Sequence, residues 1–185
     1  MILPIYVYGH PLLRKIAQDI TPDYPDLKGL VANMFETMHN ADGVGLAAPQ
    51  IGLDIRVLVI DLTSYADTDH SFKDFKKTMI NARILEADGE EKASDEGCLS
   101  IPGINESVYR KNHVKIKYVD VDFVEYEEDY YGHLARVIQH EYDHLEGKMF
   151  VDYLSGFRKQ LIKSKLNNLI NGKVRCSYRV KTVKK

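Results

Sequence analysis

The segment His140-Glu141-Tyr142-Asp143-His144 constrains the fold of this chain more than any other feature of its sequence. Apolar residues around it recur at helical spacing and predict a helix over about residues 131–146. Positions four apart in a helix differ by roughly 40° around its axis, so the two imidazoles share one face, one turn apart. This geometry can hold one metal ion. Two surface histidines without a ligand would show the same spacing, so both interpretations stay open at this point.

A catalytic metal of this type needs a third protein ligand and leaves a further position for water. In metallopeptidases with this helix motif the third ligand usually lies downstream, as a Glu or a His. Downstream of Glu146 the chain has neither residue type, and Asp152 and Cys176 are what remains there. Upstream, Cys98 follows a glycine, which lets the backbone approach a ligand closely. We therefore favour Cys98 as the third ligand, with a buried apolar cysteine as the alternative.

Hydrophobic periodicity places strands in the middle of the chain and helices before and after them. Helices are expected over residues 26–40, 131–146 and 155–171. Strands are expected over residues 55–61, 78–85 and 113–124, with a last strand within 173–183. Residues 43–50 read as a loop, and residues 63–77 as a mobile connection. The fold class is α+β, with mixed or antiparallel sheets packed around a central metal-binding helix and with a C-terminal helix.

The length of 185 residues, with 44% hydrophobic and 28% charged residues, excludes disorder and coiled coil for the whole chain and predicts one domain over residues 1–185. The net charge of -2 is unevenly spread. Eleven Lys or Arg and one Asp follow Gly147, so residues 148–185 form a basic C-terminal helix and tail. Such a segment contacts nucleic acid or is a solvated helix face, and the charge count alone favours the second interpretation.

The N-terminus has no basic leader, and Pro4 and Gly9 interrupt its short apolar run, so we do not expect a secretory signal. No apolar stretch approaches the roughly 20 residues that span a bilayer. We expect a cytoplasmic protein that does not contact membranes. In that compartment Cys98 and Cys176 are expected to serve as a ligand, a nucleophile or core residues rather than as a disulfide.

Three separated blocks carry a family resemblance: residues 43–50 (Gly-Val-Gly-Leu-Ala-Ala-Pro-Gln), residues 96–100 (Glu-Gly-Cys-Leu-Ser) and residues 139–147 (Gln-His-Glu-Tyr-Asp-His-Leu-Glu-Gly). In this order they resemble the three signature motifs of the peptide deformylases, and the resemblance spans residues 2 to about 170. It implies a metal-dependent hydrolase that removes the formyl group from the N-terminal formylmethionine of nascent polypeptides.

The resemblance also implies roles for individual residues. The implied metal ligands are Cys98, His140 and His144. Glu141 would take a proton from the metal-bound water and pass it to the departing amine. Gln50 and the backbone N–H of Leu99 would donate hydrogen bonds to the formyl oxygen as it gains charge.

Substrate contacts are implied in the same way. The peptide would pair like a strand with backbone groups at Val44, Gly45 and Gly97. The pocket for the methionine side chain would be lined by Val44, His133, Arg136 and Val137. His133 and Arg136 are more polar than such a pocket needs, so either their heads reach solvent or the assignment is wrong. Glu96 is expected near the pocket rim, with Arg110 as its charge partner.

The resemblance implies one divalent metal ion as cofactor, Fe²⁺ in the cell, with Ni²⁺, Co²⁺ or Zn²⁺ able to occupy a purified sample. The ligand types alone do not choose among these ions. The expected partners are formylmethionyl nascent chains. Some members of the family dock on the ribosome through the C-terminal helix, so residues 158–166 are a candidate ribosome contact, without sequence-specific recognition of nucleic acid. Two alternatives remain: a metallopeptidase of the same helix motif that cleaves internal bonds, and a structural zinc module in which Glu141 is incidental.

Overall fold

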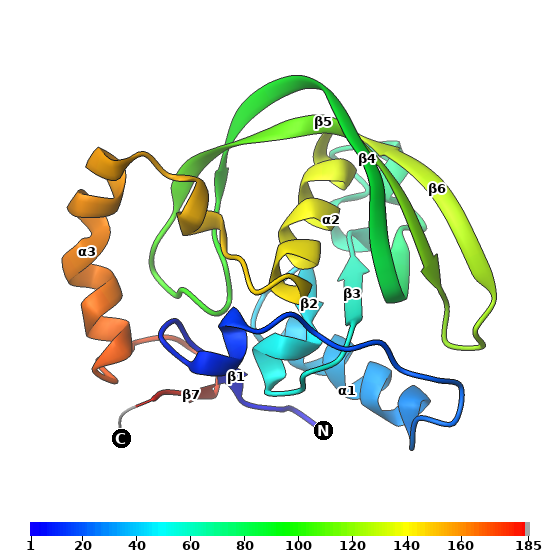
Figure 1. Ribbon diagram of the computed structural model, residues 1–185, viewed down its shortest axis with the longest axis horizontal. Helices are drawn as coiled ribbons and strands as arrows, with labels where there is room; N and C mark the ends of the chain where they lie inside the picture. Colours follow the sequence, from blue (N-terminus) through cyan, green and yellow to red (C-terminus); the bar gives the residue numbers. More distant parts are fainter. Residues whose placement is uncertain (184–185) are drawn as a thin grey trace.

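A computed structural model of the protein describes residues 1–183 (Figure 1). Its helices are α1 (Leu27–Asn40), α2 (Gly132–Leu145) and α3 (Gly156–Ile170). Its strands are β1 (Ile5–Tyr6), β2 (Gly45–Ala47), β3 (Val57–Asp61), β4 (Lys76–Glu96), β5 (Glu106–Val119), β6 (Glu125–Tyr131) and β7 (Val180–Lys181). The predicted α+β class is confirmed.

Five strands form an antiparallel sheet in the order β2-β3-β4-β5-β6, while β1 pairs in parallel with β7. The long strands β4 and β5 form a hairpin that arches over α2, and α3 lies apart at one end of the molecule (Figure 1). The pairing of β4 with β5 shifts register at three places along its length. Such irregularities bend a strand pair and increase its twist, which lets the hairpin curve around the helix.

The helix α2 occupies the centre of the fold because it is enclosed on nearly every side. Ten of its 14 residues are buried. Its apolar residues Ala135, Ile138 and Leu145 are fully buried in the cluster that also contains the inner face of the sheet. The helix ends before Gly147, where a side chain would meet the Arg14 carbonyl oxygen at 2.6 Å and where φ is +68°. A residue with a Cβ would therefore be strained at this helix end.

Several predicted strand boundaries are wrong, because the burial of these segments does not follow the apolar pattern that was used to place them. The strand expected over residues 78–85 is the much longer β4, whose second half is exposed on both faces and so lacks an apolar period. The strand expected over residues 113–124 is the end of β5, and β6 follows after a turn. Residues 43–50, expected as a loop, contain β2 and enter a 3₁₀ turn, and both are wholly buried.

The connection over residues 63–77 was expected to be mobile, but Phe72 and Phe75 anchor it in the core at 6% and 7% exposure. The last predicted strand, within residues 173–183, is reduced to the two residues of β7. In the part of the chain that the structure describes, no helix combines the length and the apolar composition of a membrane span.

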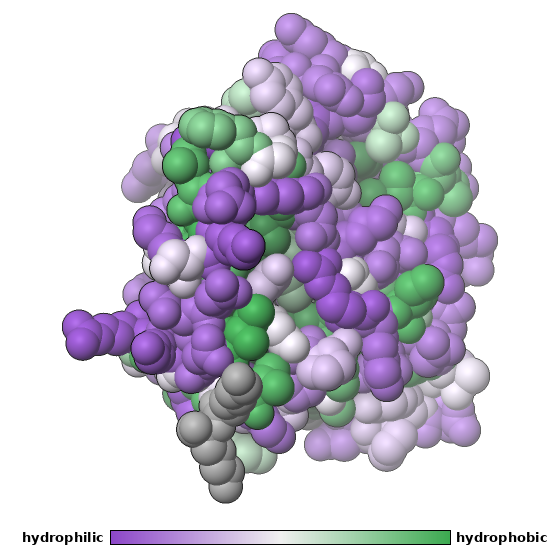
Figure 2. All heavy atoms as spheres, turned by 60° about the vertical axis from the view of Figure 1, so that its left-hand side comes forward, coloured by the Kyte–Doolittle hydropathy of each residue, from purple (hydrophilic) through white to green (hydrophobic). Residues whose placement is uncertain are grey.

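The helix α3 buries Ile162, Leu166 and Leu169 against the rest of the protein. Its outer face exposes Phe157 and Leu161 beside basic residues. The side of the molecule shown in Figure 2 is mainly hydrophilic, with apolar residues in separate patches.

Candidate metal centre

Three potential metal ligands from distant parts of the chain meet at one point. One ligand atom each from Cys98, His140 and His144 lies within 4.8 Å of the others. The two imidazoles come from one face of α2, with ring centroids 5.3 Å apart. Cys98 lies just after β4, and its Sγ is 3.2 Å from His144 Nε2. The convergence predicted from the sequence is therefore present.

The chemistry of these groups fits a divalent transition metal. A thiolate and two neutral imidazoles are ligands that such ions prefer. Burial and the neighbouring His140 hold the pKa of His144 well below its usual range, so this ring is neutral and able to ligate. Burial opposes protonation of His140, but Cys98 and Glu96 outweigh it and hold its pKa well above the usual range. Cys98 and Glu96, which favour a positive charge on this ring, would also favour a metal cation bound beside it.

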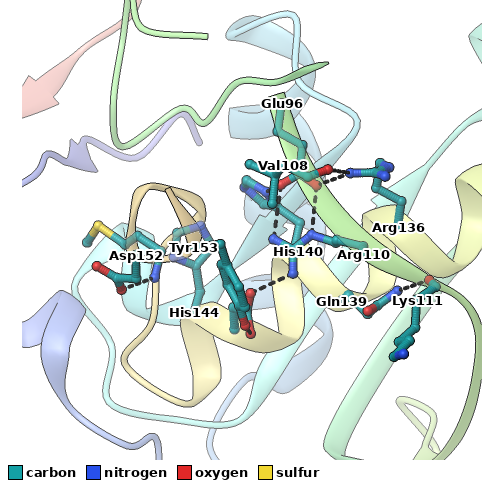
Figure 3. A network of polar contacts seen from close by, with 12 residues as sticks. Glu96, Val108, Arg110, Lys111, Arg136, Gln139, His140, His144, Asp152 and Tyr153 are labelled. Carbon is teal, nitrogen blue, oxygen red and sulfur yellow. Dashed lines mark hydrogen bonds and ion pairs between the residues drawn. The ribbon is translucent and has the colours of Figure 1, made fainter. Parts of the chain in front are cut away.

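Glu96 orients His140 from behind (Figure 3). The carboxylate accepts a hydrogen bond from His140 Nδ1 at 2.9 Å, which leaves Nε2 of that ring for a metal. It also accepts from Arg110 Nε at 2.7 Å and Nη2 at 3.0 Å, and from Arg136 Nη1 at 2.7 Å. Burial disfavours the charged carboxylate, but the hydrogen bonds from His140 and Arg110 lower its pKa to about 2. Glu96 is thus ionised.

The structure shows the partner of Glu96 and how deeply its side chain is buried. Arg110 is its charge partner, as expected. Glu96 lines the pocket, but only 5% of its side chain is exposed, because its oxygens face His140 and the two guanidinium groups. The end of β4 places it there, where the strand is buried again after its exposed middle.

A second carboxylate extends this network. Arg110 Nη1 donates to Asp143 Oδ2 at 2.8 Å, and the Tyr153 hydroxyl donates to Asp143 Oδ1 at 2.9 Å. Asp143 follows His140 by three positions, so both lie on the helix face that is turned toward Arg110 of β5. Sequence reasoning missed Tyr153, which lies in a 3₁₀ turn with no motif of its own.

Glu141 is held against the backbone of β2. Its side chain is buried, and its Oε2 has no hydrogen-bond partner among the described residues. Burial raises the pKa of Glu141 to about 7. A Cβ at Gly45 would overlap the Glu141 carboxylate, so only glycine allows this close approach. A buried carboxyl with an open oxygen and a raised pKa can accept and return a proton.

Gln50 and Leu99 flank the thiol. Gln50 Oε1 accepts from the Ala47 N–H at 2.8 Å, which fixes the orientation of the amide. Its Nε2 then faces Ser100 Oγ at 3.2 Å and Cys98 Sγ at 3.5 Å. A carboxamide held by its oxygen presents a fixed N–H donor beside the candidate metal centre.

A pocket of about 520 Å³ opens onto this centre. It is lined by every residue named as a substrate contact from the sequence, namely Val44, Gly45, Glu96, Gly97, His133, Arg136 and Val137. Gln50, Cys98, Leu99, His140 and Glu141 also line it. The pocket further includes Tyr65 and the C-terminal segment 175–178, neither of which sequence reasoning identified.

The polar residues of the pocket are not arranged as the sequence suggested. The guanidinium of Arg136 does not reach solvent, because it binds Glu96, the Val108 carbonyl at 2.9 Å and the Lys92 carbonyl. Its charge is therefore matched by Glu96. Burial and the nearby Arg136 lower the pKa of His133, which favours its neutral form. The ion pair of Arg136 and the neutral form of His133 reduce the polarity that the two residues present to the pocket.

A thiol and two imidazoles around one point, with a buried carboxyl beside them, are the groups that a hydrolase uses when a divalent metal activates water. Fold and site together define the class of metal-dependent hydrolases. Within this class, the chain belongs to the polypeptide deformylase family, whose sequence model matches residues 2–160.

Relatives and solved structures agree with this membership. A peptide deformylase of Flavobacterium psychrophilum is 52% identical over 192 residues, covering 100% of this chain and 99% of the relative. One of Flavobacterium johnsoniae is 54% identical over 188 residues, covering 98% and 96%. The crystal structure of a peptide deformylase from Legionella pneumophila matches with a TM-score of 0.81 and 37% identity, covering 95% of this chain and 99% of that one. The family supports a deformylase over the metallopeptidase alternative.

Proposed function

We propose that this protein hydrolyses the formamide of N-terminal formylmethionine on nascent polypeptides. The observation that carries the proposal is the meeting of Cys98, His140 and His144 at one point, beside a pocket that Cys98, His140 and the buried Glu141 line. The membership of the family supports the same reaction. Nascent chains emerge in the cytoplasm, so the proposed substrate places the enzyme there.

Cys98, His140 and His144 would hold one divalent ion, which we propose to be Fe²⁺ in the cell and Ni²⁺, Co²⁺ or Zn²⁺ in some purified samples. When bound, the ion supplies Lewis acidity, which polarises a carbonyl and lowers the pKa of a water molecule. Glu96 keeps the ring of His140 turned so that its Nε2 faces the site.

The remaining chemistry belongs to the side chains and backbone of the pocket. Glu141 takes a proton from the attacking water and delivers it to the nitrogen of the leaving amine. The amide of Gln50 and the N–H of Leu99 donate hydrogen bonds to the formyl oxygen while negative charge develops on it. The fixed Gln50 amide requires little reorganisation for this role, because Ala47 already holds its oxygen.

Substrate selection follows from backbone pairing and one side-chain pocket. The peptide aligns beside Val44, Gly45 and Gly97, which tolerates many sequences because backbone groups make the contacts. The methionine side chain enters between Val137, His133 and Arg136. The pairing of Arg136 with Glu96 supports this assignment, since the guanidinium is neutralised and its apolar stem is what remains for packing.

The reaction is tested with anaerobically purified protein and the peptide formyl-Met-Ala-Ser. We expect release of formate that stops on chelation and returns when the metal is restored. A blocked peptide with internal bonds is the matched control, and we expect no cleavage of it. Endopeptidase activity without deformylation would refute the proposal. A protein inactive with every metal supplied, whose Glu141→Ala variant keeps its metal and its fold, would indicate the structural zinc module instead.

We further propose that exposed basic residues of α3 contact the ribosome. Lys163 and Lys165 are exposed there, and basic segments bind phosphate backbones through salt-sensitive contacts. Replacing both by Glu should weaken co-sedimentation with ribosomes at low salt. The control exchanges Lys73 and Lys92, exposed lysines elsewhere in the chain, in the same way. Equal co-sedimentation of both variants and the wild type would refute the contact.

A further inference from the structure

The segment that contains Leu99 is held in place by three successive carbonyl groups. The Cys98 oxygen accepts from the Ile101 N–H, and the Ser100 oxygen accepts from the Tyr8 N–H, each at 2.8 Å. Between them, the Leu99 oxygen accepts from the Tyr178 hydroxyl at 2.8 Å. The outer two bonds have backbone donors. The middle bond has a side-chain donor, so a single substitution can remove it.

Tyr178 reaches this segment from the far end of the chain. It lies within the C-terminal segment 174–181, in which half-buried and exposed residues alternate. This segment is fixed to the N-terminal strand, since β7 pairs with β1 and the Ile5 N–H donates to the Arg179 carbonyl at 2.9 Å. The match to the family's sequence model covers residues 2–160, so this segment lies outside the matched range.

We propose that Tyr178 is a positioning residue for the backbone N–H of Leu99. The inference rests on the proposed function, in which this N–H stabilises the developing oxyanion. The N–H of Leu99 belongs to the peptide group of the Cys98 carbonyl, and the Leu99 carbonyl belongs to the next peptide group. Fixing both carbonyls fixes the two dihedral angles of Leu99 and with them the direction of its N–H. Oxyanion stabilisation depends on donors that are oriented before the reaction.

The surroundings of Tyr178 suit this role. Its ring packs against the same core cluster as Leu99 does, so the hydroxyl has a defined position. A tyrosine hydroxyl is protonated and able to donate at neutral pH, and burial raises the pKa of Tyr178 further. Tyr178 lines the substrate pocket together with Arg175, Cys176 and Ser177, and its hydroxyl reaches the Leu99 carbonyl from that wall.

The test is Tyr178→Phe, which keeps the packed ring and removes the hydroxyl. A lost hydrogen bond of this kind corresponds to about a two- to tenfold effect. We expect kcat for formyl-Met-Ala-Ser to fall by about that factor, with KM and bound metal unchanged. The matched control is Tyr6→Phe, which removes a hydroxyl that accepts from Lys181 Nζ at 3.0 Å at the same junction of chain ends. We expect it to keep the wild-type kcat.

A second measurement does not depend on activity. In metal-free protein, amide hydrogen exchange at Ile101, whose N–H closes the turn over Leu99, should accelerate about two- to tenfold in Tyr178→Phe and stay unchanged in Tyr6→Phe. An active wild type with unchanged kcat in Tyr178→Phe, or with an equal loss in both variants, would overturn this inference and leave the proposed function intact. A wild type that cannot deformylate would overturn the proposed function, and the positioning role would fall with it.

Discussion

Glu96 shows at the scale of a single residue how the protein prepares a metal ligand. Its buried carboxylate receives His140, Arg110 and Arg136, so its negative charge is fully compensated. A histidine ring that donates one N–H to such a group has its other nitrogen fixed toward the metal. Arg110 and Arg136 therefore stabilise the buried carboxylate and, through it, hold the ring of His140 in place.

The first prediction concerns Arg110. Arg110→Ala would leave Asp143 buried without its charge partner and Glu96 with Arg136 and His140 alone, and we expect the free energy of unfolding to fall by about 3–5 kcal/mol. Urea denaturation measures the loss. Arg83→Ala is the control, since Arg83 makes an exposed ion pair with Asp19 and should cost at most about 1 kcal/mol. Equal losses in the two variants would contradict the role of the buried network.

The second prediction concerns the contact of Gly45 with Glu141. The Cβ of Gly45→Ala would displace the Glu141 carboxyl, so we expect kcat to fall by about 100-fold or more, the usual contribution of a general base, with metal content retained. Steady-state kinetics and elemental analysis check it. Gly156→Ala serves as the control, because a Cβ there meets no atom within 4 Å. A Gly45→Ala enzyme with the wild-type kcat would show that Glu141 is free to move or is not needed.

At the scale of elements, α2 was the most predictable part of the molecule and the β4–β5 hairpin the least. The helix was expected over residues 131–146 and spans Gly132–Leu145, because apolar periodicity and glycines mark both of its ends. Its ligands followed from the same periodicity. The exposed middle of β4 carries no apolar alternation, so its length could not be predicted. The polar network around Glu96 depends on the register of this hairpin, which the bulges set.

The third prediction belongs to the middle of that hairpin, where Asp88 pairs with His113. His113 of β5 contacts Asp129 of β6 at 2.7 Å and Asp88 of β4 at 2.6 Å. Hydrogen bonds to these carboxylates raise its pKa above the usual value of 6.5. A group with a raised folded pKa stabilises fully below its unfolded pKa and loses that effect as pH rises through the folded pKa.

We therefore expect the melting temperature of the wild type to exceed that of His113→Gln at pH 6, and the difference to shrink as the pH rises above neutrality. Thermal unfolding of both proteins across this range measures the difference directly. The variant shares every other titrating group, so their contributions cancel in the comparison. A difference that stays constant or grows with pH would contradict the three-strand ion pair.

At the scale of the whole molecule, distant segments are joined at one site. The metal ligands come from Cys98 and from α2. Residues near the two chain ends, Tyr178 and Tyr8, donate hydrogen bonds to the carbonyls of Leu99 and Ser100, which follow Cys98. The resemblance of three sequence blocks predicted the first convergence. The second could not be predicted, because Tyr178 belongs to no motif and its partner is a backbone carbonyl, which leaves no trace in the sequence.

The fourth prediction is that metal links these segments thermodynamically. A metal bound by the folded state and not by the unfolded state stabilises the protein in proportion to the logarithm of its free concentration. Chelation should therefore lower the melting temperature of the wild type, and restoring the metal should raise it again. Cys98→Ala should show a smaller metal-dependent shift. A wild type whose melting temperature ignores chelation and metal addition would contradict the prediction.

The central claim is that the sulfur of Cys98 and one nitrogen each of His140 and His144 bind the same cation. X-ray absorption spectroscopy of the zinc-loaded protein tests it most directly. We predict one sulfur at about 2.3 Å and two imidazole nitrogens at about 2.0–2.1 Å from the metal, with the sulfur lost in Cys98→Ser. A metal bound without any sulfur, or a sulfur signal that survives Cys98→Ser, would contradict the account.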